Sequence, residues 1–134
     1  MTPLGKGVAW ICVVYGAATM LAPPALYVLW RQVPPTPAIA FWLSLGLVTL
    51  LGGYFALKGN RWAFWLLFAI FAVQIADYWS PHLFVSFFGP LAVKTGWSWP
   101  SPPRRINVNL VAIAGAALAL ICALTHRARQ SSTR

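Results

Sequence analysis

Residues Trp62–Trp79 read WAFWLLFAIFAVQIADYW, a strongly apolar stretch that contains the one acidic residue of the chain, Asp77. A helix needs about 20 apolar residues to cross the hydrocarbon core of a bilayer, which is about 30 Å thick. The stretch is apolar to Ala76, continues through Asp77, and ends before a break at Ser80 and Pro81. It therefore predicts a membrane-spanning helix over residues 62–79.

Three further stretches, at residues 8–30, 38–57 and 106–125, are long, apolar and free of charged side chains. Only 8% of the 134 residues are charged, against roughly 25% in a soluble domain. Because lipid cannot pair backbone N–H and C=O groups, segments that cross a bilayer form helices. The sequence predicts an all-α integral membrane protein with a single membrane domain over residues 1–134, built as a four-helix transmembrane bundle.

The loops between these spans differ in length and character. Gln32–Pro37 is a short proline-rich turn, and Lys58–Arg61 is a tight turn that makes the second and third helices antiparallel. Between the third and fourth spans, apolar residues at helical spacing predict a short interfacial helix over about 81–92. The run Trp97–Pro103 contains three prolines, so we expect an extended cap there.

The first span raises two questions of its own. Pro23 and Pro24 remove helical N–H donors, which predicts a kink or a stop. Lys6, followed by an apolar run and small residues, also resembles a signal peptide, but the best small-residue cleavage site ends at Ala22 and is followed by proline. We expect an uncleaved membrane anchor.

Basic residues suggest which side of the membrane each loop occupies. The chain carries a formal charge of +9, in short clusters between long uncharged stretches, which favours membrane topology over nucleic-acid binding. With four spans, six basic residues fall on the side of the termini (Lys6, Lys58, Arg61, Arg127, Arg129, Arg134) and four on the other (Arg31, Lys94, Arg104, Arg105). We expect both termini in the cytoplasm and the chain in a bacterial cytoplasmic membrane.

Asp77 is the strongest candidate for a functional residue. At about 1.5 Å per residue it lies some 24 Å along the third helix, near the outer end of the hydrocarbon. A carboxylate at that depth is expected to pair with a cation, and Arg31 is favoured over Arg104 and Arg105. Alternatively Asp77 is an ion or proton site, assisted by its neighbours Gln74 and Tyr78.

Small residues recur along the fourth span, where they predict close helix packing. This stripe suits the centre of the bundle or the contact face of a homo-oligomer or larger membrane complex: Ala112, Gly115, Ala116, Ala119 and Ala123. Asn107 and Asn109, at its outer end, are expected to satisfy backbone groups or to meet the outer cap. Cys12 and Cys122 share a depth, and we interpret them as buried thiols that behave as small apolar side chains.

No catalytic, cofactor-binding or metal-binding motif is found in the sequence. The scarcity of polar residues in the spans favours a non-enzymatic protein, an accessory or assembly subunit of a membrane complex. A small transporter or channel that uses Asp77 is the alternative. An enzyme acting on a lipid or a quinone is the weakest hypothesis, since it depends only on the interfacial segment.

Overall fold

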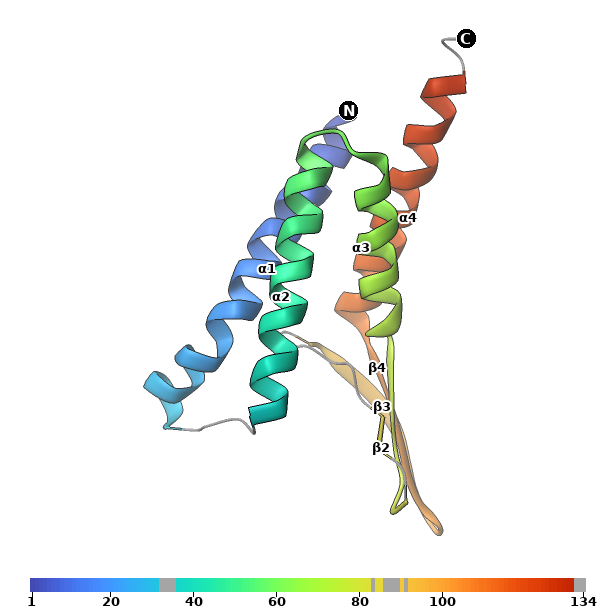
Figure 1. The fold of residues 1–134 in the computed structure, drawn as a ribbon. Coiled ribbons are helices and arrows are strands. Elements are labelled where there is room, and N and C mark those ends of the chain that lie inside the picture. The colour runs from blue at the N-terminus through green and yellow to red at the C-terminus, as the bar shows by residue number, and fades with distance from the viewer. Residues whose placement is uncertain (32–35, 83, 86–89, 91, 132–134) are drawn as a thin grey trace.

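The computed structural model describes residues 1–31, 36–82, 84–85, 90 and 92–131, without the side chains of residues 30, 79, 84, 85 and 126–131. Its elements are α1 (Pro3–Trp30), α2 (Thr36–Leu57), α3 (Arg61–Val73), β1 (Ala76–Trp79), β2 (Phe84–Val85), β3 (Lys94–Pro100), β4 (Pro103–Asn109) and α4 (Leu110–Ser131). The chain is mostly helical. Figure 1 shows α1 paired with α2 and α3 with α4, and a small sheet that extends beyond the ends of α3 and α4.

The helix α1 continues through Pro23 and Pro24 instead of stopping at them. It begins where the Thr2 hydroxyl accepts a hydrogen bond from the Gly5 N–H at 3.0 Å. It ends at Arg31, whose backbone is left-handed (φ 55°) and whose N–H donates to the Tyr27 carbonyl.

Glycines allow α1 and α2 to approach backbone to backbone. A Cβ atom on Gly16 would lie 2.6 Å from the Leu50 nitrogen and 2.7 Å from the Gly46 oxygen. A Cβ on Gly53 would lie 2.8 Å from the Ala9 oxygen. Any larger residue at Gly16 or Gly53 would therefore push the two helices apart.

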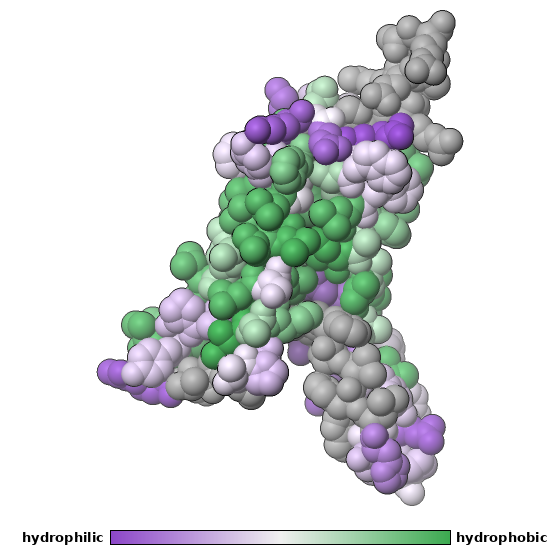
Figure 2. All heavy atoms as spheres, viewed as in Figure 1, coloured by the Kyte–Doolittle hydropathy of each residue, from purple (hydrophilic) through white to green (hydrophobic). Residues whose placement is uncertain are grey.

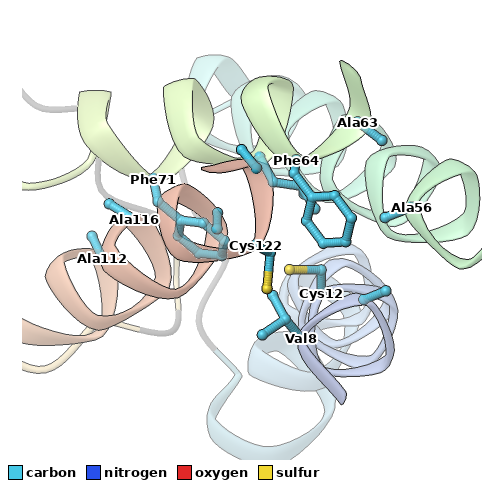
Figure 3. Packing of buried hydrophobic residues seen from close by; sticks show 13 residues of the cluster. Val8, Cys12, Ala56, Ala63, Phe64, Phe71, Ala112, Ala116 and Cys122 are labelled. Carbon is cyan, nitrogen blue, oxygen red and sulfur yellow. The ribbon is translucent and has the colours of Figure 1, made fainter. Parts of the chain in front are cut away.

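The small-residue stripe of α4 is buried inside the chain. Ala112, Ala116, Ala119 and Ala123 belong to the core, and a Cβ on Gly115 would lie 2.8 Å from the Phe71 ring of α3. Of the two roles that the sequence left open, packing within the bundle accounts for this stripe. The stripe belongs to a cluster of buried apolar side chains. Figure 3 shows the sulfur atoms of Cys12 and Cys122 pointing toward each other within this cluster.

The third helix is shorter than the sequence predicts and the fourth begins later, because a sheet takes up the end of α3 and the expected start of α4. The helix α3 ends at Val73, and residues 76–79 form β1; β4 occupies residues 103–109, so α4 begins only at Leu110. The expectation of an all-α chain is therefore wrong. The N–H groups of Gln74 and Ile75 bond to carbonyls three residues back, which tightens the last turn of α3 before the strand begins.

The sheet has strand order β2-β1-β4-β3, and its neighbouring strands are antiparallel. The extended cap expected at Trp97–Pro103 is extended, but as part of a hairpin in which Pro100 lies opposite Pro103. The interfacial helix expected over 81–92 falls partly outside the described residues. Its described pair Phe84 and Val85 forms β2, not a helix, because it pairs with Trp79 and Tyr78 of β1.

Large apolar side chains cover the outside of the helices, and small ones fill the inside. Leu21 and Val28 are 64% and 69% exposed, whereas Ala9 and Ala56 are fully buried. Figure 2 shows a hydrophobic band over the middle of the helices with polar residues at both ends. Both α1 and α2 are long and apolar enough to cross a bilayer. The N-terminus, the α2–α3 turn and the end of α4 lie at one end of the helices, and the sheet lies at the other (Figure 1).

Candidate functional site

Asp77 lies on a strand, where the sequence predicts a helix. It is the second residue of β1, and its partner across the sheet is Asn107 of β4. Asp77 is 7% exposed and Asn107 is 9% exposed. A buried carboxylate needs hydrogen-bond donors, and this strand pairing supplies them from a residue remote in sequence.

Asn107 connects Asp77 to an arginine. The Asn107 side-chain amide donates to Asp77 Oδ1 at 2.6 Å, and the Asn107 backbone N–H donates to the same oxygen at 3.2 Å. The Asn107 side-chain oxygen accepts a hydrogen bond from Arg105 Nε at 2.9 Å. Within the described residues Asp77 makes no direct ion pair, because Asn107 lies between the acid and the guanidinium.

Alternation along the strands gives the sheet two different faces. Asp77, Asn107, Arg105, Gly96 and Ser98 share one face, which we call the polar face. Tyr78, Ile106, Trp97 and Trp99 share the other, the aromatic face.

Gly96 faces Asn107 across the β3–β4 pair. A Cβ atom there would lie 2.5 Å from the Asn107 side-chain oxygen and would also collide with the Ile106 carbonyl. Glycine at this position therefore leaves room for the Asn107 amide to lie flat on the polar face and bridge Arg105 to Asp77.

A cavity of about 410 Å³ opens on the polar face beside Asp77. Its lining also includes Asn107, Ser98, Trp99, Pro103, Arg104 and Arg105. A hollow of about 290 Å³ lies by the aromatic residues Tyr78 and Trp99. The cavity beside Asp77 combines a carboxylate with the guanidinium group of Arg105 on one face of the sheet, so it is the candidate functional site.

The other residues proposed from the sequence lie elsewhere. Arg31 is at the end of α1 with its guanidinium 5.9 Å from the centre of the Tyr27 ring, and it makes no ion pair with Asp77. Gln74 is buried at the end of α3, where its Nε2 donates to the Ile70 carbonyl at 3.1 Å. Tyr78 lies on the aromatic face, opposite to Asp77. The structure therefore does not join Asp77, Arg31, Gln74 and Tyr78 into one network.

Sequence analysis missed Asn107 as the partner of Asp77, although a signal was present. Polar and apolar residues alternate over Arg105–Asn109, the period of a half-exposed strand. The expected backbone role of Asn109 is confirmed, since its side-chain oxygen accepts from the N–H groups of Val111 and Ala112 at the start of α4.

Among the described residues, no three His, Cys, Asp or Glu side chains come together where they could hold a metal ion. Comparison of the chain with protein-family models, with curated proteins and with solved structures finds no match.

Proposed function

We propose that this chain is a non-enzymatic integral membrane protein, an accessory subunit that crosses the bilayer with all four helices and presents its sheet to a partner subunit on one side. The exposed apolar side chains of the helices support the membrane part, because lipid would cover the surface that water would otherwise meet. The excess of basic residues on the side of the termini favours a cytoplasmic location for both chain ends in a bacterial cytoplasmic membrane.

The lengths of the elements are compatible with this placement. The 22 residues of α2 extend about 33 Å, enough to cross the hydrocarbon. The 13 residues of α3 extend only about 20 Å. From Val73 to Asp77 the chain adds about 11 Å, as a tight turn to Ile75 and as extended strand beyond it. Asp77 therefore lies about as far from the Lys58–Arg61 turn as the first turn of α2 does, at the boundary between hydrocarbon and headgroups.

The accessory-subunit proposal is based on the edge strand β3. It lies at the edge of the sheet, its seven residues are all exposed, and Trp97 and Trp99 are 62% and 49% exposed. A long exposed edge strand with large apolar side chains is a template for strand addition by another chain. We therefore assign the partner surface to β3, on the aromatic face and its outer edge, rather than to the buried stripe of α4.

The transporter alternative has less support. A carrier residue in the middle of the bundle would need a polar path on both sides, but Asp77 lies in the sheet beyond the end of α3. Most of the described side chains buried between the helices are apolar, and the buried polar ones, Thr19, Thr49 and Gln74, carry no charge. Proton or cation flux in liposomes that is lost on Asp77→Asn would favour transport; unchanged flux would argue against it.

Photo-crosslinking in native membranes tests the accessory-subunit proposal. A benzophenone amino acid replaces Thr95 on exposed β3 in one variant and Leu47 on the outer surface of α2 in the control. We expect a discrete protein adduct from position 95 and lipid adducts alone from position 47. Absence of any protein adduct at position 95, or identical adducts at both positions, would contradict a partner surface on β3.

A further inference from the structure

The carboxylate of Asp77 is held through only one of its oxygens. Both hydrogen bonds from Asn107 go to Oδ1. Within the described residues Oδ2 has no partner, and it is not among the enclosed side-chain atoms, which are those of Thr19, Gln74 and Asn109. Because Asp77 lines the cavity on the polar face, Oδ2 is the acceptor that this cavity offers to a ligand.

The guanidinium group of Arg105 stands beside that acceptor, on the same face of the sheet. Arg105 uses Nε to hold Asn107, which leaves its two terminal nitrogens without a partner among the described residues. Arg105 is exposed, whereas Arg104 pairs with Trp99 and lies on the aromatic face. Guanidinium groups bind phosphate oxygens in a bidentate manner, whereas a carboxylate repels phosphate and attracts an ammonium group. The cavity therefore suits a ligand that carries a phosphate and an amine together.

We propose that the cavity beside Asp77 binds a phosphoethanolamine group, with the phosphate on Arg105 and the primary ammonium on Asp77 Oδ2. The ammonium donates a charge-assisted hydrogen bond to the free oxygen. A choline group cannot do so, since its nitrogen carries three methyl groups and no hydrogen. A glycerol group offers only neutral hydroxyls, which make the weaker bond.

The position of the cavity in the membrane, at the level of the lipid headgroups, favours a phospholipid as the source of the phosphoethanolamine group. Asp77 lies at the boundary between hydrocarbon and headgroups if the helices cross the bilayer, so this step rests on the membrane placement proposed above. Binding of the headgroup itself does not depend on that placement. A ligand without acyl chains therefore tests the chemistry separately from the source.

Calorimetric titration of the full-length chain in a maltoside detergent tests the proposal. The probes are glycerophosphoethanolamine and glycerophosphocholine, which have the same phosphate diester and differ at the nitrogen. We expect the ethanolamine compound to bind at least about tenfold more tightly. In Asp77→Asn, where the amide oxygen can still accept from Asn107, we expect this preference to disappear. In Arg105→Gln, both probes should bind more weakly.

Lys58→Gln is the matched control, since it removes a cation at the other end of the helices, away from the cavity. It should leave both affinities unchanged. Equal binding of the two probes by the unaltered protein, or an unchanged preference in Asp77→Asn, would overturn the site.

The same comparison in nanodiscs of phosphatidylethanolamine or phosphatidylcholine tests whether the ligand is a lipid. If the headgroup compound binds in detergent but the protein shows no preference between the two lipids in nanodiscs, the lipid assignment is wrong. The ligand is then a soluble phosphoethanolamine compound. A separate measurement tests the membrane proposal: release of the chain from membranes at alkaline pH would contradict it.

Discussion

Asn107 places its side-chain amide nitrogen 2.6 Å from the carboxylate of Asp77, a residue 30 positions earlier in the chain. The same side chain accepts a hydrogen bond from Arg105 with its oxygen. An amide can donate and accept at once, which neither a carboxylate nor a hydrocarbon side chain does. Asn107 therefore ties β1 to β4 and keeps the one acidic side chain of the protein hydrogen-bonded in a buried position.

Replacing Asn107 by alanine should destabilise the protein. The change removes the side-chain donor to a buried carboxylate, a loss of about 1–3 kcal/mol in the free energy of unfolding. Thermal unfolding of the purified protein in detergent measures it. A double-mutant cycle with Asp77→Ala, which removes the acceptor, is the control: the two effects should couple by at least about 0.5 kcal/mol. Strict additivity would contradict an interaction between these side chains.

Gly16→Ala should weaken the packing of α1 on α2. Its new methyl group would lie 2.6 Å from the Leu50 nitrogen, so the helices must separate. Gly7→Ala is the matched control on the same helix, because a Cβ there meets nothing within 4 Å. Alanine is the better helix former by about 0.5–1 kcal/mol, so Gly7→Ala should be neutral or stabilising. Similar melting temperatures for the two variants would be inconsistent with the backbone contact.

Oxidation should join Cys12 to Cys122. Both thiols are free and buried, and their sulfur atoms point toward each other between α1 and α4 (Figure 3). A membrane-permeant oxidant such as copper phenanthroline with oxygen should convert the two thiols into an intramolecular disulfide. Mass spectrometry of the digested protein detects the linked peptides, and Cys12→Ala should abolish them. If the unaltered protein yields no linked peptide, the contact between α1 and α4 is different from the one described here.

Labelling of single cysteines should place the two ends of the helices on opposite sides of the membrane. Lys58→Cys marks the α2–α3 turn, and Thr95→Cys marks β3, each in a chain whose Cys12 and Cys122 are alanine. With intact cells, an impermeant maleimide should modify position 95 but reach position 58 only after permeabilisation. Modification of both positions from outside would exclude a crossing between them, and the reverse pattern would invert the orientation.

The positions of the helices follow from the sequence. Long uncharged runs and the tight turn at Lys58–Arg61 are local features, and they mark α2 and most of α1 and α4 correctly. The recurrence of small residues in α4 likewise indicates a closely packed face, because helical periodicity alone brings these residues to one side. The cap formed by Asn109 is local too, since its oxygen bonds to N–H groups two and three residues ahead.

The tertiary structure alone decides where α3 ends and what Asp77 contacts. The apolar run 62–76 is equally compatible with a helix that continues through Asp77, and nothing local favours Val73 as its end. Strand pairing with β4 makes the difference, because it offers Asp77 two donors from Asn107 that no residue near it in sequence supplies. The same pairing draws Asn107 out of the expected fourth span and brings Arg105 to the candidate site. The alternation over Arg105–Asn109 indicates a strand but not its partner, and no local pattern pairs Asn107 with an acid 30 residues away, so folding of the whole chain is needed to create this site.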